Sequence, residues 1–281
     1  MTPPAMTPPA KTLPALALSH LSALDTPPDL LAPLAAKAGF AAIGLRLNPA
    51  APGGISYPLR AGTDKVRTLQ RALADSGIGI HDVELIPLTP GLAIADFEPM
   101  LEAAAALGAR RLNVTGDDPD LDRLGDHFAA VCAFAARFGL GVDLEFMRWR
   151  PVGTLAQARH VVERAGAAGG GILLDFLHIF RAGGAVADVA NLPKGLITGA
   201  QVCDAPLAAP PDDRIIEEAR TRRLPPGSGA LPIIALLRAL PADVPLSVEV
   251  PQSPGSSDPV ATHLATLHQS TMRTLAAAGR V

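Results

Sequence analysis

Eight short apolar runs alternate along this chain with longer segments of helical period. Each run has the length and composition of a parallel strand that is buried on both faces. The runs are Ala15–His20, Ala42–Leu47, Ile78–Ile86, Arg111–Thr115, Gly141–Phe146, Gly171–Asp175, Ile197–Cys203 and Leu246–Val250. Strands that alternate with helices of ten or more residues form right-handed βαβ units, in which the strands are parallel. Eight such units in roughly 250 residues predict an α/β fold, a single (β/α)8 TIM barrel.

The segments between the runs carry helix signals. Asp64–Ser76 has its apolar residues on one face and is followed by Gly77, while Thr154 and Gln157 have the spacing of a capping box for a helix that runs to Ala165. Further helices are predicted at Asp96–Leu107, Leu121–Phe138, Val186–Asn191, Leu231–Leu240 and Asp258–Ala278. A doubly wound open sheet is the alternative, but the first strand–helix turn lacks a G-x-G-x-x-G loop.

The first 13 residues repeat the pentamer Met-Thr-Pro-Pro-Ala and predict a flexible, Pro-rich tail, so that residues 14–281 form one catalytic barrel domain. The apolar stretch that follows is interrupted by Pro14, Ser19 and His20, which fits a first strand better than a signal peptide. No segment reaches the 18 or more apolar residues of a membrane span. Two cysteines in apolar contexts favour a reducing compartment, and we expect a cytoplasmic protein.

The charge pattern bears on the partners of the chain. Its net charge of −3 comes from 24 basic and 27 acidic residues that are spread along the sequence, with one Trp and one Tyr. A nucleic-acid groove would need a basic surface and aromatic side chains on which bases stack. We therefore expect no nucleic-acid or membrane partner. The expected partner is a small-molecule substrate that is anionic or polyhydroxylated, and a homodimer is left open.

The last four predicted strands each carry a polar side chain near the carboxyl end, namely Glu145, Asp175, Gln201 and Glu249. Chemistry in a (β/α)8 barrel takes place at that edge, and consecutive strands lie side by side there, so we expect these side chains to converge. Three carboxylates that converge in a dry cavity raise each other's pKa and oppose folding. A divalent cation is the simplest remedy, and oxygen ligands suit Mg²⁺ or Mn²⁺ better than zinc.

Other polar residues are candidates for contact with the substrate. His178 follows Asp175 by three residues, which favours a role beside the metal or on the substrate over that of an ordinary loop histidine. Glu84 and His20 rank first among further inward-facing candidates. Arg181, Gly183 and Gly184 are predicted to break the chain before a helix forms.

Arginines suggest that the substrate carries an anionic group, because a guanidinium fork suits a carboxylate or a phosphate. Alternation in the second strand places Arg46 opposite Ile43, with a salt bridge on the barrel exterior as the alternative. Arg181 is a further candidate. So is a loop cluster that consists of Arg214, Arg220, Arg222 and Arg223. We expect most of these arginines, including Arg181, to be solvated.

Five segments carry a family resemblance: LEFM at 144–147, LDFLHIFRAGG at 174–184, GAQVCDAP at 199–206, RLPPGSGALP at 223–232 and SVEVP at 247–251. From about Pro14 onward the chain resembles the xylose-isomerase-like TIM barrels. This sugar phosphate isomerase/epimerase superfamily includes hydroxypyruvate isomerases, ketose 3-epimerases, and inosose and 3-dehydroshikimate dehydratases.

The resemblance implies one divalent metal, with Mn²⁺ or Mg²⁺ favoured and Zn²⁺ or Co²⁺ open. Its implied ligands are Glu145, Asp175, Gln201 and Glu249, and His178 would contact the substrate. Many epimerases of this superfamily carry His where this chain has Gln201, which leaves the substrate class open.

The resemblance also implies a mechanism, in which the metal polarises a ketone and stabilises the enediolate that forms when the α-proton leaves. Glu145 and Glu249 are the implied acid/base pair. Returning the proton gives isomerisation or epimerisation of a small sugar-like hydroxyketone or hydroxyketo acid, which is the function we expect.

Expelling a β-hydroxyl instead gives dehydration of a cyclic hydroxyketone such as 3-dehydroshikimate or an inosose, which is the main alternative. A non-catalytic sugar-binding barrel is less favoured. A DNA-repair endonuclease of related fold is disfavoured, because it would use three zinc ions and many histidines, whereas seven histidines are scattered here.

Overall fold

The computed structural model describes residues 16–253 and 255–281, and in them eight parallel strands close into one barrel. Each strand pairs with its neighbours in sequence, and β1 also pairs with β8. The strands are β1 (Ala17–Leu18), β2 (Ala42–Arg46), β3 (Gly79–Leu88), β4 (Arg111–Gly116), β5 (Gly141–Glu145), β6 (Gly170–Asp175), β7 (Ile197–Val202) and β8 (Leu246–Val248). The predicted (β/α)8 barrel is confirmed. The predicted tail and Ala15 lie outside the described residues.

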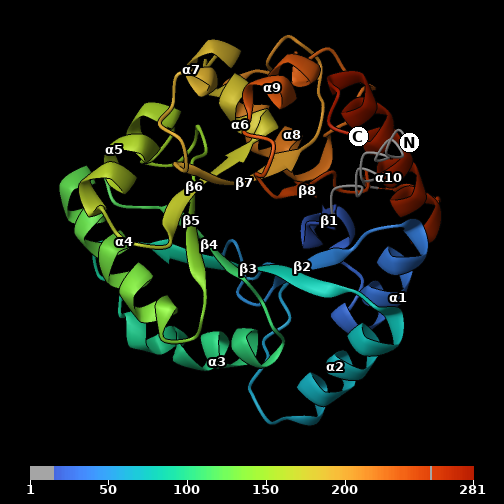
Figure 1. The fold of residues 1–281 in the computed structure, drawn as a ribbon, viewed down its shortest axis with the longest axis horizontal. Coiled ribbons are helices and arrows are strands. Elements are labelled where there is room, and N and C mark those ends of the chain that lie inside the picture. Colours follow the sequence, from blue (N-terminus) through green and yellow to red (C-terminus); the bar gives the residue numbers. More distant parts are fainter. Residues whose placement is uncertain (1–15, 254) are drawn as a thin grey trace, which may run out of the picture.

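Helices surround the strands on the outside of the barrel (Figure 1). They are α1 (Pro28–Ala38), α2 (Asp64–Ser76), α3 (Glu98–Ala106), α4 (Leu121–Ala136), α5 (Leu155–Ala165), α6 (Phe176–Arg181), α7 (Val186–Ala190), α8 (Ile215–Thr221), α9 (Ile233–Ala239) and α10 (Val260–Ala278). Short 3₁₀ turns lie at η1 (His20–Ala23), η2 (Ile94–Phe97) and η3 (Asp212–Arg214). Among the helices described here, none combines the length and the apolar character that crossing a bilayer requires.

Three of these helices differ from the sequence-based expectations. α1 and α8 were not predicted, and α6 forms where Gly183 and Gly184 were expected to prevent a helix. The cause at α6 is its cap: Asp175 Oδ1 accepts hydrogen bonds from the backbone N–H groups of Leu177 at 2.8 Å and His178 at 2.9 Å. Because these groups would otherwise lack partners, the carboxylate starts the helix directly at the strand end.

The interior of the barrel is polar at the end opposite to the carboxyl ends of the strands. Asp143 on β5 accepts a hydrogen bond from Arg111 Nε at 2.8 Å and another from the hydroxyl of Thr198. Asp82 on β3 is also buried, and a Cβ atom on Gly44 would lie 2.4 Å from its Oδ1, so only glycine leaves room for this carboxylate. Large apolar side chains fill the space between strands and helices.

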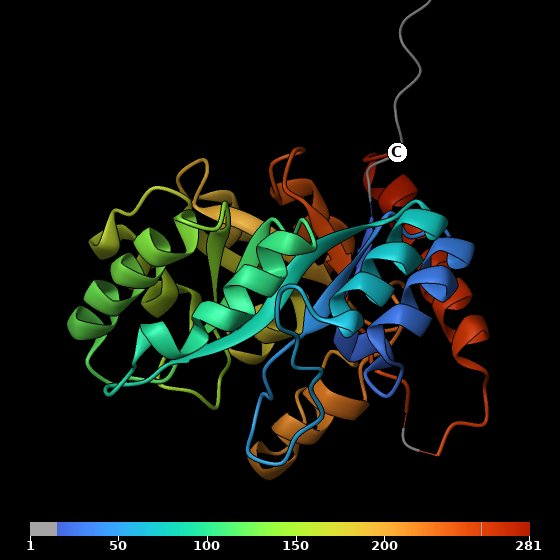
Figure 2. The ribbon, with the colours of Figure 1, turned by 90° about the horizontal axis from the view of Figure 1, so that it is seen from below.

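Two segments project from the carboxyl end of the barrel: the loop after β2 and the chain after β7 that contains η3 and α8 (Figure 2). The second segment is held by Asp204. Its Oδ1 accepts from the N–H groups of Ala205 and Leu231 at 2.8 and 3.1 Å, and its Oδ2 from those of Gly227 and Gly229 at 3.1 and 2.9 Å. Four such bonds fix the path of this segment over the barrel mouth.

The capping box that opens α5 provides a test of local stability. Thr154 Oγ1 accepts from the N–H of Gln157 at 3.2 Å, and the Gln157 side chain accepts from the N–H of Thr154 at 3.1 Å, as predicted. We expect Thr154→Ala to lower the free energy of unfolding by about 1 kcal/mol, measured by urea denaturation.

Thr63→Ala is the matched control. Thr63 is the N-cap residue of α2 but forms no cap hydrogen bond, since its hydroxyl donates to the Arg60 carbonyl. Thr63→Ala should therefore lower the free energy of unfolding by less than about 0.5 kcal/mol. Equal losses in the two variants would contradict this account of α5.

Candidate metal centre and active site

A cavity of about 270 Å³ opens at the carboxyl end of the barrel, between the two projecting segments. Charged side chains from several strands and loops line it: Arg46, Glu84, Glu145, Arg150, His178, Arg220, Arg223 and Glu249. Apolar side chains of the loop after β2, such as Ile55, and Trp149 after β5 complete the wall. This arrangement of titratable groups in one concave site is the usual form of an active site.

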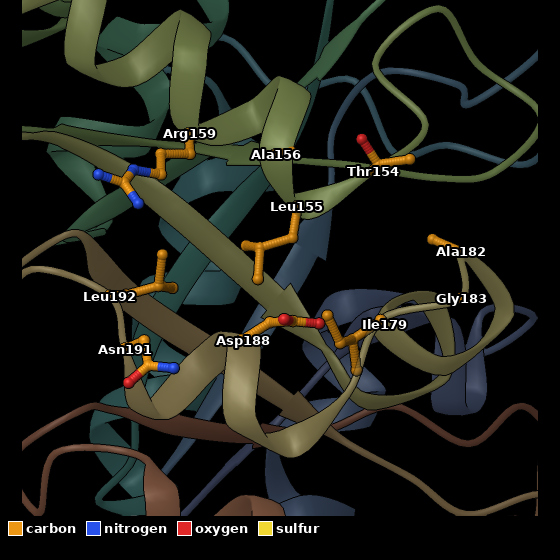
Figure 3. A pocket seen from close by; sticks show the side chains of 11 residues that line it. Thr154, Leu155, Ala156, Arg159, Ile179, Ala182, Gly183, Asp188, Asn191 and Leu192 are labelled. Atoms are coloured by element: carbon orange, nitrogen blue, oxygen red, sulfur yellow. The ribbon is translucent and has the colours of Figure 1, made fainter.

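A second hollow, of about 400 Å³, lies in the outer layer between α5, α6 and α7 (Figure 3). Leu155, Ile179 and Leu192 line its floor, and the carboxylate of Asp188 is used by the backbone N–H of Ala185 at 2.7 Å. No group of three or more potential metal ligands is found there among the described residues. We therefore place the site in the barrel mouth.

Three buried side chains of the mouth form a potential metal site. Glu145 ends β5, Asp175 ends β6, and His178 lies in the first turn of α6. Each offers one ligand atom, and these atoms lie within 4.8 Å of one another. His178 Nε2 is 3.5 Å from Glu145 Oε1. The strand ends thus bring together two of the four predicted ligands, with His178 beside them.

The other two predicted ligands lie on the adjacent strand ends. Gln201 on β7 donates from Nε2 to Glu249 Oε1 at 3.0 Å, and the hydroxyl of Ser19 donates to the same oxygen at 2.7 Å. Gln201 Oε1 and His178 Nδ1 are buried and have no hydrogen-bond partner within the described part of the chain. Since a buried polar atom normally has a partner, Gln201 Oε1 fits a cation that it would help to hold. The ring nitrogen of His178 that faces Glu145 is Nε2.

The donor set also bears on the kind of metal. Carboxylate and amide oxygens alone would suit Mg²⁺ or Mn²⁺, but a neighbouring imidazole nitrogen equally suits zinc. The residues therefore fit a divalent cation without selecting one.

Most of the loop cluster was expected to be solvated, but Arg223 is buried, at 4% exposure. Its guanidinium contacts Asp175 Oδ2 at 2.5 Å and Glu249 Oε2 at 2.9 Å. The reason is the Asp204-held segment, which folds back over the mouth and carries Arg223 between the two carboxylates. Glu145 has no arginine partner among the described residues, and only His178 lies within ion-pair distance of it.

The directions of the pKa shifts indicate that nearby positive charge does not offset the burial of Glu145 and Glu249. Burial raises the pKa of Glu145 well above its ordinary value, and the charges of Glu249 and Asp175 raise it further. Burial raises the pKa of Glu249 to about 7, although Arg223 opposes the shift. For Asp175 burial acts in the same direction, but the charge of Arg223 and the hydrogen bonds from Arg223 and the backbone N–H of His178 outweigh it, and the pKa is lowered. A divalent cation would stabilise all three carboxylates.

His178 is neutral at pH 7, because burial lowers its pKa to about 4. The ring of Trp149 packs edge-on against it, with centroids 5.1 Å apart. A neutral imidazole fixed in this way can bind a cation through a ring nitrogen, whereas its lowered pKa disfavours protonation.

Arg46 and Glu84 form a buried ion pair in the cavity wall, with Arg46 Nη2 at 2.7 Å from Glu84 Oε2. Arg46 thus faces the barrel mouth, and the alternative of a salt bridge on the exterior is wrong. His20 contacts this pair from the side, since its Nδ1 accepts from the backbone N–H of Arg46 at 2.9 Å. His20 also stacks on Tyr57, at 5.1 Å between ring centroids.

Two predicted arginines are placed outside the cavity. Arg181 donates from Nε and Nη2 to Glu218, both at 2.7 Å, and to the Pro206 carbonyl, so it fastens α6 to the segment after β7. Arg214 is exposed and pairs with Glu217 at 2.8 Å. Arg220, by contrast, lines the cavity.

Arg150 and Trp149 line the cavity but were not among the predicted residues. Arg150 forms an ion pair with Asp117, which follows β4. The available signal was the position of both residues, a few residues beyond Glu145 in a βα loop, which is where substrate-binding groups of such barrels lie.

Comparison with known proteins agrees with this geometry. The family model described as xylose isomerase-like TIM barrel matches residues 32–273. The chain belongs to this family. This membership confirms the resemblance to the isomerase/epimerase superfamily.

One curated relative is a 3-dehydroshikimate dehydratase of Pseudomonas aeruginosa, which is 34% identical over 161 residues. The match covers 55% of this chain but 25% of that protein, so the chain spans only part of the relative's length. A similar solved structure is a xylose isomerase-like TIM barrel/4-hydroxyphenylpyruvate dioxygenase fusion protein, with a TM-score of 0.76, 22% identity, and coverage of 93% of this chain and 44% of that one.

Another similar solved structure is that of the IOLI protein with a bound zinc atom. Its TM-score is 0.72 and its identity 17%, and the match covers 93% of this chain and 98% of that one. At these identities the two structures support the fold alone.

Metal binding can be tested directly. We expect Glu145→Gln to weaken binding of Mn²⁺ at least about tenfold in calorimetric titration of the purified protein, because the variant removes a charged ligand. Asp118→Asn is the control, since Asp118 is buried but pairs with Arg123 outside the cavity. Equal Mn²⁺ affinity in Glu145→Gln and the wild type would exclude Glu145 as a ligand.

Proposed function

We propose that this chain is a divalent-metal-dependent dehydratase of a cyclic hydroxyketone that carries a carboxylate, with 3-dehydroshikimate as the first substrate to test. The similarity to a 3-dehydroshikimate dehydratase over 161 residues carries this choice. The cluster of buried carboxylates and His178 supports the requirement for a metal. Isomerisation or epimerisation, the function first expected, begins with the same proton abstraction and is the competing candidate.

The metal would be held by Glu145, Asp175, Gln201 and Glu249, with His178 adjacent. When bound, it would act as a Lewis acid on the substrate carbonyl and its neighbouring hydroxyl. The hydrogen bonds that Gln201 and Ser19 donate to Glu249 Oε1 fix the orientation of that carboxylate. Arg223 fixes Asp175 and Glu249 relative to each other.

Glu145 and Glu249 are the proposed acid/base pair. Both are buried, and a carboxylate without its hydration shell is a stronger base than one in water. One of them takes the proton from the carbon next to the carbonyl. Departure of the β-hydroxyl with a proton then releases water, and tautomerisation makes the ring aromatic. The reaction converts 3-dehydroshikimate to 3,4-dihydroxybenzoate and water, so neither an oxidant nor a reductant is required.

The decisive assay follows the fate of the ring. With Mg²⁺ or Mn²⁺ present, 3-dehydroshikimate should yield aromatic proton signals and the ultraviolet absorbance of 3,4-dihydroxybenzoate, and EDTA should abolish both. We expect Glu145→Gln to lower kcat at least about 100-fold, the usual cost of losing a general acid/base. Asp118→Asn should retain activity.

The same assay in D₂O, with hydroxypyruvate, ketoses and an inosose, tests the competing candidate. Deuterium next to the carbonyl together with an isomer or epimer, and no aromatic product, would overturn the dehydratase proposal in favour of an isomerase. No turnover of any substrate and no effect of EDTA would favour a non-catalytic sugar-binding barrel.

A further inference from the structure

Arg220 differs from the other arginines of the cavity wall in its surroundings. It lies in the last turn of α8, lines the cavity, and forms no ion pair with a carboxylate in the described residues. Partial burial lowers the pKa of Arg220, and the positive charges of Arg150 and Arg46 lower it further. Arg220 shares the cavity wall with Glu84, Glu145 and Glu249, but in the described part of the chain none of these carboxylates pairs with it. Its guanidinium therefore keeps N–H donors with which it can bind an anion from solution.

Arg150 is held in place on the neighbouring wall. Its ion-pair partner Asp117 is itself fixed, because Asp117 Oδ2 accepts from the hydroxyl of Thr115 at 2.6 Å. Nη2 of Arg150 lies 3.5 Å from the Ala50 carbonyl, too far for a strong hydrogen bond. Arg150 therefore keeps donor capacity for a ligand, whereas Nη2 of Arg46 is used by Glu84.

A count of the charged groups at the barrel mouth also indicates that the site can bind an anion. The arginines are Arg46, Arg150, Arg220 and Arg223, and the carboxylates are Glu84, Glu145, Glu249, Asp117 and Asp175. With a divalent cation, the four arginines make six positive charges against five negative ones. The difference would be one positive charge, and Arg220 is the arginine of this set that has no ion-pair partner in the described part of the chain. A substrate with a single negative charge would balance it, whereas a neutral sugar would not.

We propose that Arg220 and Arg150 together bind the carboxylate of the substrate and thereby restrict this site to small monocarboxylates. This inference rests on the proposed function for the identity of the substrate, but not for its charge. Two planar guanidinium groups can each donate two N–H groups to a carboxylate. The cavity of about 270 Å³ has room for a six-membered ring with one such group.

The test compares two ligands that differ only in the carboxylate, 3,4-dihydroxybenzoate and catechol. The chain has one tryptophan, Trp149, and it lines the cavity, so its fluorescence reports binding directly. The Mg²⁺-loaded wild type should bind the acid at least about tenfold more tightly than catechol. Arg220→Gln should weaken binding of the acid roughly 10- to 100-fold and leave catechol unchanged.

Arg222→Gln is the matched control. Arg222 is two residues from Arg220, exposed, and paired with Glu217 outside the cavity at 2.7 Å. It should bind both ligands like the wild type. Arg220→Lys should recover part of the lost affinity, since it restores the charge without the fork. Because Arg220 is exposed and unpaired in the described residues, its variants should unfold at the wild-type temperature. Arg150→Lys tests the second arginine without removing the partner of Asp117.

The outcomes separate this inference from the proposed function. Binding of the acid that depends on Arg220, without formation of aromatic product from 3-dehydroshikimate, would support the carboxylate site and overturn the dehydratase. If Arg220→Gln forms aromatic product with an unchanged KM and binds the acid with unchanged affinity, the dehydratase proposal is supported and the carboxylate site is overturned. Equal weakening of acid and catechol would show a general structural effect and overturn the carboxylate site. So would displacement of the acid by inorganic phosphate at concentrations where acetate has no effect.

Discussion

The buried ion pairs of Arg223 with Asp175 and Glu249 determine how the mouth of this barrel is built. Removing a carboxylate from water costs several kcal/mol, and that cost is offset only by a close cation with good hydrogen-bond geometry. One planar guanidinium serves both carboxylates, because its two Nη groups point in different directions. Glu145 lies beside them and has no arginine partner among the described residues. A divalent cation would supply the positive charge that is missing next to this carboxylate.

Arg223 reaches this position because the chain after β7 is folded back by Asp204, whose carboxylate accepts four backbone N–H groups. The turn requires glycine at Gly229, where a Cβ atom would lie 2.4 Å from the Ala205 carbonyl oxygen. The same segment carries α8, and with it Arg220, to the rim of the cavity. This segment therefore supplies one arginine that neutralises Asp175 and Glu249, and a second one, Arg220, that has no ion-pair partner among the described residues.

The parts of this structure that could be predicted depend on local pattern. Apolar runs and capping signals are encoded within about ten residues, and the order of parallel strands then places Glu145, Asp175, Gln201 and Glu249 at one edge. The parts that could not be predicted depend on contacts between distant residues. Arg223 and Arg214 look alike in the sequence, and only the fold, which brings Arg223 to Asp175 across 48 residues, separates the buried one from the exposed one. Arg150 and Asp117, 33 residues apart, were missed for the same reason.

Dehydration and isomerisation share their first step, so the buried carboxylates alone do not choose between them. The choice is made by the substrate that the site admits. The ring of 3-dehydroshikimate already holds a C=C bond, so it loses water readily after proton abstraction because the product is aromatic. An open-chain ketose gains no such stabilisation from loss of water, and return of the proton competes with elimination. With a divalent cation bound, an unpaired arginine at the rim would favour the ring that carries a carboxylate over a neutral ketose. In this chain the reaction would therefore be decided by an arginine that takes no part in the proton transfer.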